Sequence, residues 1–423
     1  MASEELQPLQ GMADLGPPEV ARWQNLEAEA RRLLSLYGFS EIRTPVLERS
    51  ELFVRSLGGE TDVVQKEMYL FEDRGGRSVA LRPEGTAGVM RHVASRGQDA
   101  QDARLYYIGP MFRCERPQAG RRRQFHQLGV EAIGVPNPAA DAEVIALHAH
   151  LLKSWGLEQC RIQINTRGLP GDRAVVQQRM RELLEPHRAA LCPDCQRRLD
   201  TNVLRTLDCK NPACQAIVTS LPPLTSFMSD EARVYLDEVL RLLQLLEIPV
   251  DVRPGLVRGL DYYLHTVWEI THPALGAQDA IAGGGRYQLT LGGRSVEGVG
   301  FAIGLERAIA AIAHERPLVE PERLPLVWVV AQGDPAVEDG IRLVQSLRWR
   351  GVPCQMALDR RSMKAQFRAA DRARASHVVI RGEAEREKGV FLLKDLATGV
   401  QEELDMPALM VRLNPIQLAA GRS

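Results

Sequence analysis

The sequence lacks the features that mark membrane and secreted proteins. No apolar run approaches the ~20 residues that a membrane-spanning helix needs. The first residues, MASEELQPLQGMADLG, do not combine a basic start with an apolar core, so they do not predict a secretory signal. Neither sign of charge is in excess, because 53 Lys and Arg face 54 Asp and Glu. These absences predict a cytoplasmic protein with no membrane partner.

Cysteine is scarce, with seven in 423 residues, and a cytoplasmic chain with so few does not predict a disulfide framework. Four of them form a C-x2-C, thirteen residues, C-x4-C pattern: Cys192, Cys195, Cys209 and Cys214. Two close pairs of thiolates suit a tetrahedral zinc ion, but four small buried residues in a compact insertion would fit the same spacing. The sequence leaves both interpretations open, and no metal ligand is assigned to the predicted functional site.

Length and local pattern predict the domain organisation. With 45% hydrophobic and 25% charged residues, the chain is expected to form two or three globular domains. Residues 1–168 and 246–318 mix helix and strand patterns, whereas 169–245 has helical apolar periodicity and is predicted to be an insertion. A proline-rich linker, HERPLVEPERLP, precedes alternating strand and helix patterns over 325–423, which predict a small α/β domain.

The most informative segment is RLYYIGPMFRCERPQAGRRRQFHQLGVEAIG, residues 104–134. Two apolar, aromatic strand runs flank a loop of turn-forming residues and arginines, which could hold an anion. In the second run Gln127, Gly129 and Glu131 recur at period two, so they share one face of the strand. Polar residues on one strand face predict a pocket built on a sheet. The alternative is a surface hairpin with a solvated basic tip.

Three other segments have recognisable patterns. Val20–Tyr37 predicts an amphipathic helix that Gly38 ends, and the extended segment FSEIRTPVLE follows. Glu84 follows a predicted strand and precedes a helix, where it could be a pocket carboxylate or simply a carboxylate at the positive end of that helix. GGGRY, at 283–287, predicts a glycine-rich turn that serves packing or lets backbone approach a ligand.

These segments resemble the class II aminoacyl-tRNA synthetases, and among them the histidyl-tRNA synthetases. FRCERPQAGRRRQFHQLGVE resembles motif 2 of the class, the first helix with FSEIRTPVLE resembles motif 1, GLER at 304–307 resembles motif 3, and LVRGLDYY at 256–263 resembles a histidyl-specific segment. The resemblance covers nearly the whole chain. It implies an α/β (α+β) fold with an antiparallel sheet flanked by helices, a helical insertion, a C-terminal anticodon-binding domain and a homodimer.

The resemblance also implies a reaction: ATP-dependent attachment of L-histidine to tRNA-His through a histidyl-adenylate, with Mg²⁺ on the ATP phosphates. Both reactants of the first step are anions, so the site must neutralise charge, and the planar fork of arginine suits phosphate and carboxylate. The arginines implied to be catalytic come from three distant segments: Arg113, Arg258 and Arg307.

Further roles are implied by the same motifs. Histidine would contact Glu84, Gly85, Thr86, Arg113, Gln127, Glu131, Arg258, Tyr262 and Tyr263. ATP would contact Arg113, Glu115, Arg121, Phe125 and Arg307, and tRNA would contact Gln118, Arg123, Arg360 and Lys364. Glu131 and Tyr263 would hold the imidazole, since hydrogen bonds discriminate better than size. Arg360, Lys364, Arg368 and Arg372 recur every four residues, which predicts one basic helix face or, alternatively, a merely solvated one.

Two departures from the family pattern keep other functions open. GGGRYQLTLGGR is shorter than usual, and Gln288 stands where an Asp commonly follows the tyrosine. One alternative is a non-catalytic, synthetase-like regulatory subunit of ATP phosphoribosyltransferase in histidine biosynthesis, although such paralogues usually lack the C-terminal domain. Another is a tRNA-binding module with degenerate catalysis. Histidine-dependent exchange of pyrophosphate into ATP separates these functions from a ligase.

Overall fold

The computed structural model describes residues 6–59, 61–96, 102–115, 121–257, 262–291, 293–317, 325–359 and 361–414, with only the backbone at 208, 277 and 278. The chain divides into two compact units, residues 1–320 and 321–423. Three residues with predicted roles, Arg258, Gln118 and Arg360, lie outside the described ranges. Among the described residues, no helix is both long and apolar enough to span a bilayer.

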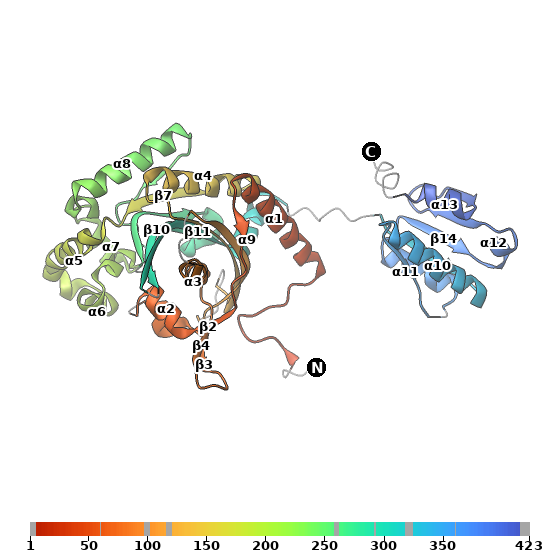
Figure 1. Cartoon of the computed structure of the whole chain (residues 1–423), viewed down its shortest axis with the longest axis horizontal. Coiled ribbons are helices and arrows are strands. Elements are labelled where there is room, and N and C mark those ends of the chain that lie inside the picture. Colours follow the sequence, from red (N-terminus) through yellow and green to blue (C-terminus); the bar gives the residue numbers. More distant parts are fainter. Residues whose placement is uncertain are drawn as a thin grey trace. The chain divides into compact units, whose positions relative to one another are not determined.

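An eight-stranded sheet forms the centre of the first unit (Figure 1). Its strands are, in spatial order, β1 (Ser40–Glu41), β5 (Arg104–Phe112), β6 (Gln124–Ile133), β11 (Arg294–Gly304), β10 (Ala280–Leu291), β9 (Tyr263–Thr271), β7 (Arg161–Thr166) and β8 (Asp251–Val252). The six inner strands pair antiparallel, and only β1 and β8 at the edges pair parallel. The predicted antiparallel sheet flanked by helices is therefore confirmed.

Helices cover one face of this sheet with a large apolar core. They are α1 (Pro17–Leu36), α4 (Pro138–Ser154), α8 (Asp230–Leu245) and α9 (Leu305–Glu315). The predicted N-terminal helix is confirmed, and Gly38 follows it with a φ of +76°, a conformation that favours glycine. Leu128 and Val130 of β6 point into this core, so the alternate residues of that strand point to the opposite face.

The opposite face of the sheet holds the two helices that frame the functional site. These are α2 (Ser50–Leu57) and α3 (Thr86–Arg96), and α3 lies within the curve of the sheet (Figure 1). A π-helical turn (Val63–Glu67) and a small sheet of β2 (Leu47–Arg49), β4 (Ser78–Leu81) and β3 (Leu70–Glu72) adjoin them. This smaller apolar core leaves room above β6 and β11 for a cavity.

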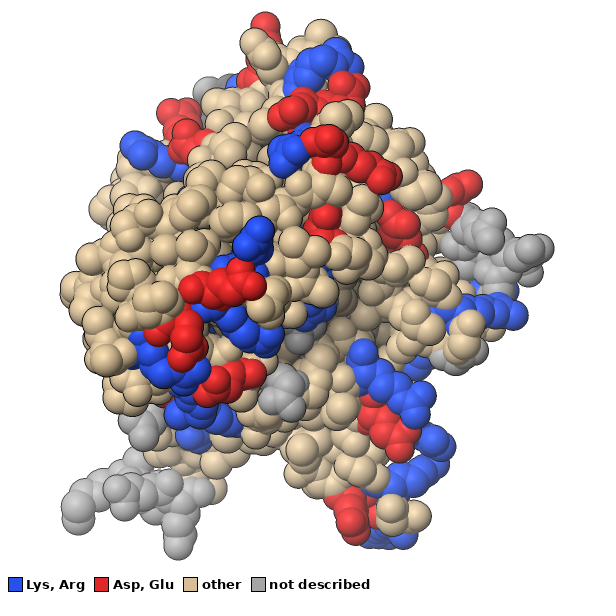
Figure 2. All heavy atoms as spheres, turned by 90° about the vertical axis from the view of Figure 1, so that its left-hand side faces the viewer, with Lys and Arg blue, Asp and Glu red and all other residues tan. Residues whose placement is uncertain are grey.

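The predicted insertion, 169–245, is helical, as expected. It contains α5 (Pro170–Leu184), α6 (Pro193–Thr201), α7 (Pro212–Thr219), 3-10 turns at Glu185–Ala190, Val203–Asp208 and Leu224–Phe227, and finally α8. Figure 2 views the molecule from the side on which α5 and α6 lie, and shows basic and acidic side chains interspersed there. Arg188, for example, lies 2.7 Å from Glu185 and 2.8 Å from Asp200. Helix α8 packs with α4 in the large apolar core.

The second unit is a small α/β domain. Its sheet runs in the order β13 (Cys354–Met356), β12 (Val327–Ala331), β14 (His377–Arg381), β15 (Phe391–Asp395) and β16 (Gln401–Leu404). Its helices are α10 (Asp334–Trp349), α11 (Met363–Arg372), α12 (Glu383–Glu387) and α13 (Met406–Arg412). Lys364, Arg368 and Arg372 are exposed on α11, whereas Arg360, the first residue of the predicted stripe, lies outside the described ranges.

The glycine-rich segment 283–287 is a strand and not the predicted turn. It lies inside β10, where β9 pairs on one side and β11 on the other. A Cβ added at Gly284 would lie 2.4 Å from the Gly300 carbonyl oxygen and 2.5 Å from the Trp268 ring. Both distances are too short, so only glycine fits between these two groups. Gly284 therefore allows close packing. Because residues 283–287 pair with strands on both sides, they do not form a turn.

Asp141 and Glu143 of α4 offer a matched test of burial. Asp141 is fully buried and accepts a 2.9 Å hydrogen bond from Nε of the buried Arg286, whereas Glu143 pairs with Arg104 at the surface. Asp141→Ala should cost about 3 kcal/mol, because the buried Arg286 would lose one of its two carboxylate partners and keep only Glu297. Glu143→Ala should cost less than about 1 kcal/mol. Equal midpoints for the two variants in urea unfolding would contradict this difference.

Candidate active site

A cavity of about 370 Å³ opens on the face of the sheet that carries α3. It brings together eleven of the residues that the sequence singled out: Glu84, Thr86, Arg113, Glu115, Arg121, Phe125, Gln127, Glu131, Tyr262, Tyr263 and Arg307. They come from segments that are up to 223 residues apart in the chain, counted from Glu84 to Arg307. One cavity that gathers these residues is what a shared functional site requires.

Glu131 lies at the closed end of the cavity, with only 1% of its surface exposed. Thr86 Oγ1 donates to Glu131 Oε1 at 2.7 Å, and Tyr287 Oη donates to Glu131 Oε2 at 2.6 Å. Gly300 faces Glu131 across the β6–β11 pair, and a Cβ there would lie 2.2 Å from Glu131 Oε2. Two hydroxyl groups thus hold the carboxyl group in one orientation, and the lack of a side chain at Gly300 leaves room for it.

The environment of Glu131 changes its acidity. Burial raises the pKa of Glu131 to about 8, and the hydrogen bonds from Tyr287 and Thr86 only partly oppose this effect. At neutral pH burial therefore favours the neutral carboxylic acid. A ligand that brings a nitrogen donor or a positive charge would favour the carboxylate instead.

This shift predicts a pH dependence of stability. The contribution of Glu131 to the free energy of unfolding should be fully present below about pH 4.5 and be lost as pH rises through its folded pKa of about 8. Glu131→Gln removes this titration, so the difference in unfolding free energy between wild type and variant should fall between pH 5 and pH 8. Urea unfolding of both proteins at four pH values measures it, and a constant difference would contradict the shift.

Glu84 is a carboxylate at the N-terminus of α3. Its Oε2 accepts from the Thr86 backbone N–H at 2.7 Å, and its Oε1 accepts from Ala87 N–H at 2.8 Å. The alternative anticipated from the sequence, a carboxylate that stabilises a helix end, is therefore present in the structure. Because Glu84 also lines the cavity, and a carboxylate can accept further hydrogen bonds, the capping contact does not exclude a ligand role.

The ring of Tyr107 fills the cavity floor beside these acids. A Cβ at Gly85 would lie 2.2 Å from its Cζ, and one at Gly129 would lie 2.1 Å from the same atom. Gly85, predicted to contact histidine, does not itself line the cavity but makes room for this ring. Burial and the nearby Glu131 and Glu84 hold the pKa of Tyr107 well above its ordinary value, so the hydroxyl keeps its proton.

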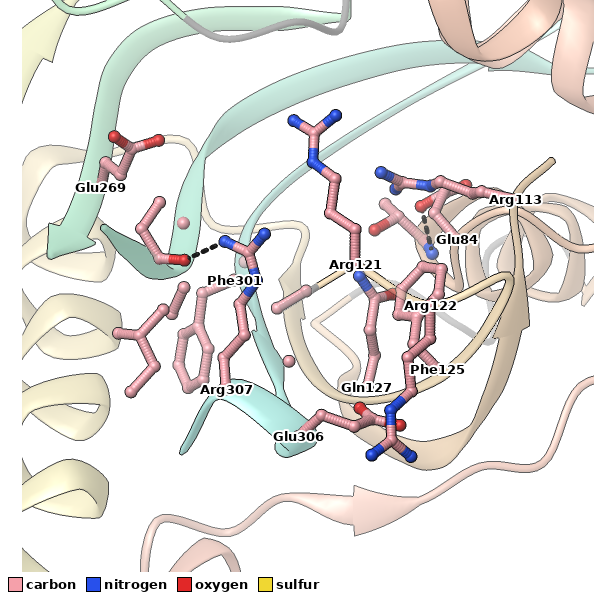
Figure 3. Close-up of a pocket in the computed structure, with 18 of the residues that line it drawn as sticks. Glu84, Arg113, Arg121, Arg122, Phe125, Gln127, Glu269, Phe301, Glu306 and Arg307 are labelled. Atoms are coloured by element: carbon pink, nitrogen blue, oxygen red, sulfur yellow. Dashed lines mark hydrogen bonds between the residues drawn. The ribbon is translucent and has the colours of Figure 1, made fainter. Parts of the chain in front are cut away.

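Several arginines also line this cavity, and Arg113 lies beside Glu84 (Figure 3). Arg113 and Arg307 reach in from different sides, and Arg121 lies between them. Burial and the positive charges of Arg121 and Arg113 lower the pKa of Arg307. Positive charges that approach one another so closely favour an anion between them.

The hairpin and α9 hold these arginines in place. Arg113 Nε donates to the Pro83 carbonyl at 2.9 Å, and its guanidinium lies over the Phe125 ring at 5.3 Å. Arg307 Nη1 donates to the Ala280 carbonyl, which fixes it along β10. Arg121 pairs with Glu115 at 2.8 Å. The arginines are therefore oriented by protein contacts before any ligand binds.

Other predicted residues support the hairpin or lie elsewhere. Arg123 does not line the cavity; its carbonyl accepts from Arg113 N–H at 2.9 Å, which closes the base of the loop. Lys364 belongs to the second unit. The sequence analysis missed Tyr107, Tyr287 and Glu306, the last of which accepts from the His126 backbone N–H at 3.0 Å. Alternation along β5 could have indicated Tyr107, because Tyr107 and Met111 share a face.

Comparison with known proteins gives one consistent family. The sequence model of the family "Histidyl-tRNA synthetase" matches residues 11–308, and that of the family "Anticodon binding domain" matches residues 326–414. A histidine–tRNA ligase of Halothermothrix orenii is 44% identical over 412 residues, which cover 96% of this chain and 98% of the relative. One of Desulfitobacterium hafniense is 45% identical over 401 residues, covering 94% and 95%.

Solved structures agree with the sequence comparison. The crystal structure of apo histidyl-tRNA synthetase from S. aureus superposes with a TM-score of 0.79 at 34% identity, and the match covers 97% of this chain and all of that one. The histidyl-tRNA synthetase from Nostoc superposes with a TM-score of 0.65 at 23% identity, which supports the fold alone.

Proposed function

We propose, from the premise that this chain belongs to the histidyl-tRNA synthetase family, that it uses ATP to join L-histidine to tRNA-His. The observation that carries the proposal is the single cavity in which a buried acidic end and an arginine-rich part lie side by side. In the first step a histidine carboxylate oxygen forms a bond to the α-phosphorus, and the bond from that phosphorus to the bridging oxygen breaks, releasing pyrophosphate. In the second step a ribose hydroxyl of the tRNA end attacks the histidyl carbonyl and AMP leaves.

The arginine-rich part suits the first step. Arg113 and Arg307 would hold the phosphates while Arg121 balances the charge between them, which lets two anions approach. Because protein contacts already orient Arg113 and Arg307, little reorganisation is needed when negative charge builds up on the phosphate. Arg258 is proposed to bind the same anions. Only its place in the sequence LVRGLDYY supports this role.

The acidic end suits recognition of histidine. Glu131 and Tyr263 would contact the imidazole, while Glu84, Thr86 and Gln127 would surround the α-amino group. Because Thr86 and Tyr287 already donate to Glu131, its carboxylate is presented as an acceptor to an imidazole N–H. An amino acid of similar size without that N–H would leave the buried carboxyl with only its two hydroxyl partners, and the lost third hydrogen bond would disfavour that amino acid.

Magnesium is proposed as the counter-ion of ATP. Mg²⁺ prefers oxygen ligands and keeps several waters, so it needs only one or two protein carboxylates near the phosphates. Glu115, Glu269 and Asp279 line the arginine-rich part of the cavity and fit that requirement. When bound, the ion would neutralise charge on the phosphates, and the arginines of this chain would orient them.

The motif 1 resemblance of α1 and β1 further supports a homodimer, which sedimentation at micromolar concentration would test. The cytoplasmic location and the domain boundaries 1–168, 169–245, 246–318 and 325–423 also remain predictions. The regulatory-subunit function is not favoured, because the relatives that match at 44–45% identity are named ligases.

Charging of a tRNA-His transcript, with and without its extra 5′ guanosine, tests the proposal. Purified protein should charge the complete transcript with histidine, and removal of the guanosine should slow charging, since Gln118 and Arg123 of the loop are proposed to lie near it. Histidine-dependent exchange of pyrophosphate into ATP should accompany charging. Binding of tRNA without either reaction would support the degenerate module instead.

The basic face of α11 is proposed to contact tRNA phosphates. Replacing Lys364 and Arg368 by Ala should weaken tRNA binding. The slope of log binding constant against log salt concentration should become shallower by roughly one for each phosphate that the protein no longer neutralises. Lys388→Ala is the matched control, because Lys388 belongs to the same unit but pairs with Glu403 at 2.7 Å. Filter binding at several salt concentrations measures both, and an unchanged slope in the double variant would mark the face as merely solvated.

A further inference from the structure

The four clustered cysteines meet at one point in the structure. Cys192 and Cys195 lie at the start of α6, Cys209 follows the 3-10 turn Val203–Asp208, and Cys214 lies in the first turn of α7. All four Sγ atoms lie within 4.8 Å of one another, and each belongs to a free thiol. Among the residues that the structure describes, this is the one group of three or more His, Cys, Asp or Glu whose ligand atoms converge in this way.

The distances suit a single tetrahedral ion. Zinc–sulfur bonds of about 2.3 Å in a tetrahedron give sulfur–sulfur edges of about 3.8 Å. The Cys192 and Cys209 sulfurs are 3.8 Å apart. Four cysteines that served packing alone would have no reason to turn every sulfur toward the same point.

Backbone groups also point at the sulfurs. Cys192 N–H donates to Cys214 Sγ at 3.2 Å, and Asn211 N–H donates to Cys209 Sγ at 3.5 Å. Backbone N–H groups that point at sulfur are a common second layer of contacts around a metal site. Cys195 and Cys214 are fully buried, so water is kept from that side of the cluster.

The two helices that carry the cluster are short. Helix α6 has nine residues and α7 has eight, lengths at which isolated helices are marginal. We propose that Cys192, Cys195, Cys209 and Cys214 bind one Zn²⁺ through four thiolates, and that this ion ties α6 to α7. All four positions are filled by protein, so the ion would be structural and closed to substrate.

The zinc-bound segment also forms part of the active-site wall. Lys210, directly after Cys209, lines the 370 Å³ cavity and a neighbouring cavity of about 550 Å³ that shares Arg113 and Arg121 with it. Four residues before Cys209, Arg205 pairs with Asp62 at 2.8 Å, beside the π-helical turn of the catalytic face. The ion would therefore fix Lys210 at the cavity, a consequence that rests on the proposed function.

Metal content of the full-length protein tests the site itself. Protein purified without chelator from zinc-supplemented cells should hold one zinc per chain by elemental analysis. A Cys209→Ser/Cys214→Ser variant should lose at least about 90% of it, because structural zinc requires all four ligands. The matched control, Cys160→Ser/Cys354→Ser, changes two cysteines outside the cluster and should keep it. The proposal would be overturned if the wild-type protein held no zinc or held iron in its place. It would also be overturned if the two double variants held equal amounts of zinc.

A measurement on unmutated protein covers the case in which the variant does not fold. Replacement of the ion by Co²⁺ should give the thiolate-to-cobalt charge-transfer band of a four-sulfur tetrahedral site. Titration with a mercurial should release the metal as four thiols react. Absence of the band, or release without reaction of these thiols, would contradict the site.

Coupling to the active site needs a separate readout. Chelator-treated wild type should show amide hydrogen exchange over 205–215 that is at least about tenfold faster, and zinc should restore the original rate. The KM for ATP should rise and recover in parallel. An unchanged KM would overturn the coupling through Lys210. A protein that holds zinc but never charges tRNA with histidine would contradict the proposed function. The proposed metal site would still stand.

Discussion

An Arg113→Ala variant is expected to lose histidine-dependent pyrophosphate exchange by about 10²- to 10³-fold, the usual cost of removing one preorganised donor to developing negative charge. Arg113 is held by the Pro83 carbonyl and by the Phe125 ring, and both contacts leave its charge in the cavity. The variant would lose the charge and the orientation together. Arg113→Lys should lose less, because it retains the charge but cannot form two parallel bonds.

Arg104→Ala is the control for this experiment. Arg104 begins the same strand, β5, but pairs with Glu143 at 2.7 Å and does not line the cavity. Its exchange rate should stay near that of wild type. An Arg113→Ala rate within about threefold of wild type, with the melting temperature unchanged, would remove Arg113 from the chemical step.

A Glu131→Ala variant is expected to lower kcat/KM for histidine by at least about 10²-fold. Hydrogen bonds to a charged group contribute ~1.5–3 kcal/mol, and the Thr86 and Tyr287 hydroxyls would also lose their acceptor. Glu131→Gln keeps the shape but turns an amide N–H₂ toward one of two hydroxyl donors, so it should retain part of the activity. Steady-state exchange with varied histidine measures both variants.

The KM for ATP provides the internal control. Glu131 is at the closed, acidic end of the cavity, while ATP is proposed to occupy the arginine-rich part, so its KM should change little. If histidine and ATP lose affinity equally, Glu131 supports the whole cavity and does not select histidine. If the KM for histidine stays constant, the proposed imidazole contact is wrong.

The sequence predicted best what depends on neighbouring residues. The period-two spacing of Gln127 and Glu131 indicated one strand face, and both line the cavity. Glu84 was less certain, because a pocket carboxylate and a helix-capping carboxylate follow the same local pattern; it caps α3 and also lines the cavity.

The missed features depend on partners far away in the chain. Tyr287 and Glu131 are 156 residues apart, and Arg286 and Asp141 are 145 apart, so no local pattern links them. The glycine-rich strand was misjudged for the same reason, since the need for glycine at 284 comes from Trp268 and Gly300 on its neighbours.

The order of β5, β6, β11 and β10 in the sheet has a consequence for synthesis of the chain. β5 and β6 are made together as a hairpin, but β11, the other partner of β6, begins only at Arg294. While a ribosome adds those intervening residues, β6 presents an open edge, which is where unwanted pairing with other chains begins. The edge of β6 that later pairs Glu131 with Gly300 of β11 is thus the part of the nascent polypeptide most in need of shielding.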